Sequence, residues 1–150
     1  MNRRMMTGLA LPLIAVMVGG AAPAGSADVQ VTVTGLRSDR GVVRACMTSQ
    51  QESFPKCRGI ANAYAANVRA HEGRLVLSFA GVRPGRYAIA LLHDENGNGK
   101  ADRALGMMPK EGFGFSRDAP VRMGPPRFDE AALDLGTGDR TVEIRMRYML

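Results

Sequence analysis

The chain has 150 residues, of which 45% are hydrophobic, and its formal net charge is +6 at pH 7. This length is sufficient for one hydrophobic core and excludes two ordinary domains. The basic residues are scattered rather than gathered with aromatic residues into a stripe, so the charge does not indicate nucleic-acid binding. We expect a monomer with a solvated basic surface.

The first 27 residues have the layout of a secretory signal peptide. A cationic start at Arg3 and Arg4 is followed by an apolar run over residues 9–18 and then by small residues. This run is far shorter than the roughly 20 residues that a membrane-spanning helix requires. We therefore predict that residues 1–27 are removed and that the mature protein, from Asp28 on, is periplasmic or secreted without a transmembrane anchor. An uncleaved membrane anchor is the alternative.

Six segments of the mature chain have the alternating or continuous apolar pattern of short β-strands. They cover residues 29–34, 42–47, 75–79, 87–92, 131–135 and 142–148. The alanine-rich stretch 60–68 fits a helix as well as a strand, and here we expect a short helical turn that leads into a strand. The elements together predict an all-β fold, an antiparallel Ig-like or prealbumin-like β-sandwich of about seven strands formed by residues 28–150.

Two of these strands, 75–79 and 87–92, are separated by a turn that contains Pro84 and Gly85. Proline presets the backbone for such a turn and glycine accepts a positive φ, so we predict a hairpin. Along residues 87–92, large apolar side chains alternate with alanines. We expect the face with the large side chains to lie in the core.

The chain has two cysteines, Cys46 and Cys57. In the oxidising space outside the cytoplasm, such a pair usually becomes a disulfide. The spacing fits neither a CxxC redox motif nor a zinc site. We predict a structural disulfide that ties the polar loop 48–56 back to the second strand. Two free thiols are the alternative.

A run of oxygen-bearing side chains follows the strand 87–92. Its residues match alternate positions of a calcium loop, with Gly99 at the sixth position, where such a loop turns sharply. The predicted ligands are Asp94, Asn96, Asn98, the backbone carbonyl of Lys100, and Asp102. The twelfth position is Leu105 instead of the glutamate of an EF-hand, so Glu111 or Asp118 would supply a further oxygen. We expect Ca²⁺ affinity near 10⁻⁴–10⁻³ M, roughly that of extracellular modules. The alternative is a tight turn without an ion, because Asn-Gly pairs also favour turns.

His93 is the candidate for acid–base chemistry, because it lies at a strand end beside several carboxylates. Paired with Glu95 or Glu111, it would serve a small periplasmic hydrolase. The more common role of such a histidine is to cap a loop, and no nucleophile completes a triad: Ser116 does not lie in a nucleophile-elbow motif.

Residues 106–128 form a long stretch without periodicity that nevertheless contains apolar side chains. Loops of this length are usually functional or disordered, and the apolar residues favour an ordered loop. We expect the loop either to close the end of the sandwich or to line a recognition surface. Phe113, Phe115 and Met123 are expected to plug the core rather than to form a ligand cage.

Three motifs, in this order, resemble a known bacterial family. They are His93 with the following DENGNGKAD, then PKEGFGFS at 109–116, and GPPRFDEA at 124–131. From Val29 to Tyr148 the chain resembles the bacterial domain of unknown function 2141 family. The resemblance implies an exported small β-sandwich, similar to prealbumin-like domains, with no established activity. The two cysteines and the alanine-rich residues 61–66 depart from the family pattern.

From these observations we expect an exported, non-enzymatic β-sandwich module. Its 94–102 loop would hold Ca²⁺, and its 106–128 loop would present a binding surface. The expected partner is a cell-envelope protein or a polysaccharide. The rival hypothesis is the hydrolase that uses His93.

Overall fold

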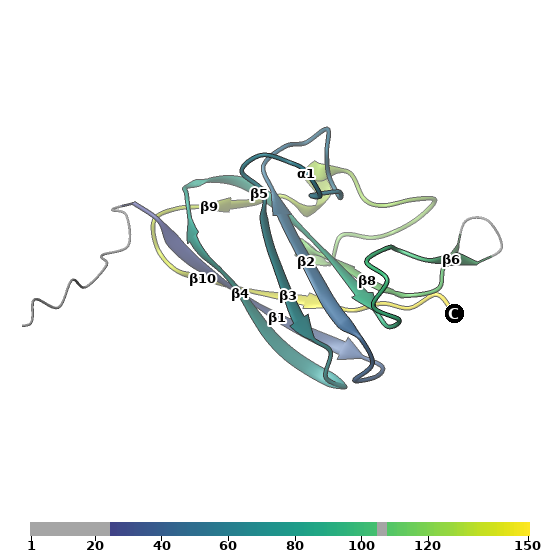
Figure 1. Ribbon diagram of the computed structural model, residues 1–150. Helices are drawn as coiled ribbons and strands as arrows, with labels where there is room; N and C mark the ends of the chain where they lie inside the picture. The colour runs from purple at the N-terminus through teal and green to yellow at the C-terminus, as the bar shows by residue number, and fades with distance from the viewer. Residues whose placement is uncertain (1–24, 105–107) are drawn as a thin grey trace, which may run out of the picture.

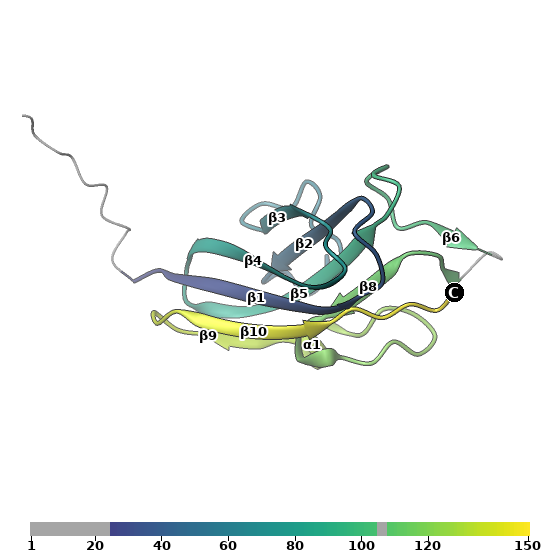
Figure 2. The ribbon, with the colours of Figure 1, turned by 90° about the horizontal axis from the view of Figure 1, so that it is seen from below.

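The computed structural model describes residues 25–104 and 108–150. Most of the predicted signal peptide therefore lies outside the described residues, as do residues 106 and 107 of the long loop. Within the described chain, no helix has the length and apolar character needed to span a bilayer. The two larger β-sheets of the described residues form a sandwich, and Figures 1 and 2 show them from two directions.

The first sheet has three strands in the order β10-β1-β4. They are β1 (Ala27–Leu36), β4 (Gly73–Val82) and β10 (Arg140–Arg145). The second sheet has the order β3-β2-β5-β8, and β9 pairs with the beginning of β5. Its strands are β2 (Val42–Thr48), β3 (Tyr64–Arg69), β5 (Gly85–Asp94), β8 (Gly112–Phe115) and β9 (Leu133–Leu135). The remaining elements are the paired β6 (Arg103–Ala104) and β7 (Met108–Pro109), the turn of 3₁₀ helix η1 (Ser116–Asp118) and the short helix α1 (Phe128–Ala131). This architecture confirms the predicted all-β sandwich.

The main core lies between the two sheets because each sheet turns an apolar face inward. Val29, Val31 and Val33 of β1 are fully buried, and Ile89 of β5 joins them from the opposite sheet. Burying a valine or isoleucine side chain stabilises the fold by about 1.5–3 kcal/mol. The period-two pattern of the sequence thus identifies these residues correctly.

The predicted hairpin of residues 75–79 and 87–92 is wrong. β4 pairs with β1 in the first sheet, whereas β5 pairs with β2 in the second. The turn at Pro84 reverses the chain but carries it from one sheet to the other. Both faces of β5 are consequently buried, the large side chains in the main core and the two alanines in a second cluster beneath α1.

Three further details differ from the sequence prediction. β1 and β10 run parallel, so the sandwich is not purely antiparallel. The predicted strand 131–135 begins only at Leu133, because the backbone N–H of Arg127 donates to the Glu130 carboxylate and starts the helix α1. The expected helical turn before β3 is instead a succession of tight turns.

Cys46 and Cys57 form a disulfide, as predicted, with Cα atoms 5.7 Å apart. The bond ties β2 to the loop of turns that follows it. Phe54 of this loop packs edge-on against Phe115 and Phe128, at centroid distances of 5.8 and 6.0 Å. The loop thereby covers the second apolar cluster.

The sheets are joined at one corner, where β8 meets the chain beyond β10. Phe113 and Arg147 exchange backbone hydrogen bonds of 3.0 and 2.8 Å. Glycines on β8 permit this close approach, because a Cβ at Gly112 would overlap the Tyr148 ring. The C-terminal residues consequently lie at the same end of the sandwich as β6 (Figures 1 and 2).

Candidate functional site

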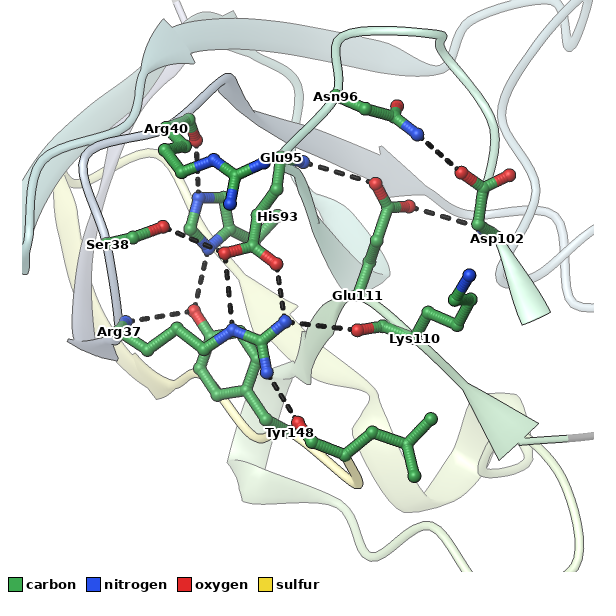
Figure 3. A network of polar contacts seen from close by, with 11 residues as sticks. Arg37, Ser38, Arg40, His93, Glu95, Asn96, Asp102, Lys110, Glu111 and Tyr148 are labelled. Atoms are coloured by element: carbon green, nitrogen blue, oxygen red, sulfur yellow. Dashed lines mark hydrogen bonds and ion pairs between the residues drawn. The ribbon is translucent and has the colours of Figure 1, made fainter. Parts of the chain in front are cut away.

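His93 lies at the centre of a polar network at this end of the sandwich (Figure 3). Its side chain is fully buried. Nε2 lies 2.8 Å from the carbonyl oxygen of Arg40, so this nitrogen donates, and Nδ1 lies 2.7 Å from the Tyr148 hydroxyl. In the neutral imidazole, Nδ1 therefore accepts the hydroxyl proton. Both ring nitrogens are occupied by contacts that hold the fold together.

Arg37 connects three segments of the chain in the same network. Its guanidinium pairs with Glu95, with Nε 3.2 Å from Oε1, and it also donates to the carbonyl oxygens of Lys110 and Leu150. It lies 4.3 Å from the centroid of the Tyr148 ring. The hydrogen bond from Arg37 lowers the pKa of Glu95 to about 2. Arg37 thereby fixes the C-terminal tail and the β7–β8 connection to the end of β1.

Asp94, the first predicted calcium ligand, is fully buried and anchors the 94–102 loop. It accepts hydrogen bonds from Arg44 Nε at 2.7 Å, from the N–H of Gly99 at 2.8 Å and from that of Asn98 at 3.1 Å. Burial opposes ionisation, but the Arg44 guanidinium and the backbone donors outweigh it, so the pKa of Asp94 lies below its usual value. Both carboxylate oxygens are therefore committed to the protein itself.

Three of the other predicted ligands converge. The side-chain amides of Asn96 and Asn98 donate to Oδ2 of Asp102 at 2.6 and 2.9 Å. Asn98 Oδ1 accepts from the backbone N–H of Lys100 at 2.8 Å, as in a tight Asx turn. Gly99 has the positive φ, 75°, that the sharp turn requires. Among the described residues, no three His, Cys, Asp or Glu side chains gather into a metal-binding group.

Glu111 reaches the loop, whereas Asp118 does not. The two oxygens of Glu111 accept the backbone N–H groups of Glu95 and Asp102, each at 3.2 Å, and so bracket the two ends of the loop. Burial raises the pKa of this carboxyl group. Asp118 instead accepts from the backbone N–H of Arg145 at 3.0 Å.

Beside this network lies an apolar groove of about 500 Å³. Its wall residues include Pro55, Leu92, Met108, Pro109, Phe113, Phe115, Val121, Met123, Pro125 and Met149. They come from the long loop, from β5, from the disulfide-tied loop and from the C-terminal tail. The groove thus lies over the stretch for which the sequence predicted either a plug or a recognition surface.

The three predicted plugs differ in burial. Phe115 is buried and packs in the cluster over Ala88 and Ala90, as predicted. Phe113 is half-buried and forms part of the groove wall. Met123 is 99% exposed, so its prediction as a core plug is wrong. It lies in the exposed segment 122–125, which forms neither helix nor strand.

Sequence reasoning missed Arg37, Arg44, Tyr148 and Met149. The only available signal for Arg44 was indirect: a buried aspartate requires a cationic partner, but the sequence does not show which strand lies beside it. Met149 carries no signal, because its place in the groove depends on how the tail crosses β8.

Comparison with known proteins identifies a family. Residues 31–143 match the model of a family described as an uncharacterized protein conserved in bacteria (DUF2141). The chain belongs to this family. The match confirms the resemblance that the motifs suggested. Searches of curated proteins and of solved structures found no significant match.

Proposed function

We propose that this DUF2141 protein is an exported, non-enzymatic binding module whose ligand occupies the apolar groove. The observation that carries the proposal is the clustering of exposed apolar side chains. Of the five large hydrophobic residues exposed in the described chain, Met108, Met123 and Met149 line the groove. They come from three separate segments, so their common position is a property of the fold.

The size and lining of the groove suit a ligand. Small-molecule pockets typically measure about 300–1,000 Å³ and are mostly apolar. Methionine side chains are flexible and polarisable, and they are frequent on surfaces that adapt to apolar partners. A largely apolar wall favours an apolar ligand over the polysaccharide considered from the sequence. The disulfide and the layout of residues 1–27 support export.

The hydrolase hypothesis receives no comparable support. His93, its expected base, is fully buried and has both nitrogens engaged. Glu95 is paired with Arg37, and Glu111 is turned towards the backbone of the 94–102 loop.

Nuclear magnetic resonance of isotope-labelled methionine methyl groups tests the proposed binding. The probe is a neutral naphthylamine dye. We expect the methyl signals of Met108, Met123 and Met149 to shift on titration, because these side chains line the groove. The signals of Met47 and Met146, which are buried in the main core, serve as internal controls and should stay in place. Absence of any shift up to the solubility limit of the dye would contradict the proposal.

We also propose that the 94–102 loop binds Ca²⁺ weakly and stiffens the adjoining groove wall. The support is the convergence of Asn96 and Asn98 on Asp102, which also lines the groove. Rotation of the two amides would turn their oxygens towards the same point as the carboxylate, giving the hard oxygen donors that calcium requires. The carbonyl of Lys100 completes the proposed set, whereas Asp94 acts as the anchor of the loop.

Thermal unfolding with Ca²⁺ and with chelator tests the ion site. For a Kd near 1 mM, about 10 mM Ca²⁺ should stabilise the protein by roughly 1.4 kcal/mol. Asp102→Asn should abolish the shift. Asp134→Asn, on the exposed side of β9, should retain it. An unchanged melting temperature of the unsubstituted protein would eliminate the calcium proposal.

A further inference from the structure

We propose that the ligand of the apolar groove is a long-chain carboxylate, that is, an amphiphile with one apolar chain and an anionic head group. The groove would bind it as a free molecule and not as part of a membrane. This inference rests on the proposed binding function and names its ligand class. It is carried by the charges at the groove and by their position beside the exposed methionines.

The two carboxylates that line the groove are already satisfied. Asp102 accepts from the amides of Asn96 and Asn98, and Glu111 accepts from two backbone N–H groups. The oxygens of both carboxylates are therefore engaged by donors of residues 95–102.

The two arginines of the groove lack comparable partners. Arg103 and Arg122 are exposed and line the groove, and neither forms an ion pair or a side-chain hydrogen bond with a described residue. Elsewhere at this end, Arg37 and Arg44 are both paired with carboxylates. Among the described residues, the charged groups of the groove that remain available to a ligand are therefore the two guanidinium groups.

Each of these arginines lies beside an exposed methionine. Arg122 directly precedes Met123 in the chain, and Arg103 lies on β6, whose partner strand β7 contains Met108. The groove therefore places apolar walls next to guanidinium groups that no described carboxylate pairs with. This arrangement suits a molecule that joins an apolar chain to an anion, and guanidinium groups can bind a carboxylate through two parallel hydrogen bonds.

Displacement of the bound naphthylamine dye by three ten-carbon amphiphiles tests the inference, all used below their micelle concentrations. They are decanoate, the neutral decyl maltoside and the cationic decyltrimethylammonium. At low ionic strength we expect decanoate to displace the dye at roughly threefold to tenfold lower concentration than the cationic amphiphile, because exposed ion pairs contribute modestly. The preference should diminish at about 1 M salt, where the screening length is only about 3 Å.

Two double variants test whether Arg103 and Arg122 cause the preference for decanoate over the cationic amphiphile. The double variant Arg103→Gln/Arg122→Gln should bind the neutral dye as before but lose the preference for decanoate. The matched control Arg69→Gln/Arg74→Gln removes two exposed arginines of β3 and β4 that do not line the groove, and it should keep the preference. If the Arg103/Arg122 variant keeps the preference, the inference is wrong.

The remaining outcomes separate the inference from the proposed function. Dye binding with equal displacement by all three amphiphiles contradicts the anionic ligand and leaves the binding function intact. Failure of the dye to bind contradicts the binding function itself. Binding to anionic phosphatidylglycerol vesicles, without displacement of the dye by decanoate, would overturn the choice of a monomeric ligand in favour of a membrane surface.

Discussion

The polar network and the apolar groove adjoin each other at one end of the sandwich, and they satisfy their side chains in opposite ways. Among the described residues, every buried side-chain nitrogen and oxygen has a hydrogen-bond partner. The polar side-chain atoms of the buried His93 and Asp94 are thus hydrogen-bonded within the protein, and the half-buried Glu95 pairs with Arg37. In the groove, by contrast, Met123 is 99% exposed and Arg122 has no carboxylate partner among the described residues. The difference teaches that the stretch richest in chemical groups is engaged in holding the fold, whereas the stretch without pattern leaves surface for a ligand.

The largest expected effect comes from breaking the ion pair between the partly exposed Arg44 and the buried Asp94. Arg44→Ala would leave the fully buried Asp94 without its cationic partner and should lower the free energy of unfolding by about 3 kcal/mol. Chemical denaturation measures the change. Arg69→Ala, an exposed arginine on β3, is the control and should change stability by less than about 0.5 kcal/mol. A loss below about 1 kcal/mol for Arg44→Ala would show that the pair is not required.

A smaller effect is expected from Arg37→Ala, because this side chain is partly exposed. Loss of its charge-assisted hydrogen bonds should cost about 1–3 kcal/mol and release residues 148–150. Faster hydrogen exchange at Met149 and Leu150 would report the release. Arg40→Ala is the matched control, since Arg40 contributes its backbone carbonyl to His93. Unchanged exchange of the tail in Arg37→Ala would exclude the proposed anchoring.

The pH dependence of the Arg37–Glu95 pair gives a third test. The folded-state pKa of Glu95 is about 2, below the ordinary value of 4.5, so its contribution to stability is fully present above pH 4.5 and is lost as the pH falls towards 2. The stability difference between the unsubstituted protein and Glu95→Gln should therefore be constant above this window and shrink within it. A difference that stays constant down to the lower end of the window would contradict the assignment.

Sequence periodicity predicts much of this fold because burial of one strand face is a local signal. The valines of β1 were identified in this way. The Cys46–Cys57 disulfide was predicted separately, from the presence of two cysteines in a chain expected to be exported. Strand pairing is not local: the turn at Pro84 indicates a reversal but not the change of sheet. The parallel pairing of β1 with β10 is likewise set by the whole core.

In the candidate site, too, the sequence predicts the local contacts but not the long-range ones. The convergence of Asn96 and Asn98 on Asp102 follows from their short spacing and the flexible glycines. The partner of Asp94 lies 50 residues earlier, and the groove combines segments that no local pattern connects. The exposure of Met123 could not be foreseen, since apolar composition alone favours burial.

The most direct test of the contrast measures stability and dye affinity together in two variants. Met123→Ser/Met149→Ser should weaken binding of the neutral naphthylamine dye by roughly tenfold, or about 1.4 kcal/mol, and leave the unfolding free energy nearly unchanged. Arg44→Ala should lower the free energy of unfolding and leave dye affinity nearly unchanged, measured under conditions in which the variant remains folded. Val76→Ser, which removes an exposed apolar side chain outside the groove, should leave dye affinity unchanged. Unaltered dye affinity in the double methionine variant, or an equal loss of affinity in Arg44→Ala, would contradict the assignment of binding to the groove and of stability to the polar network.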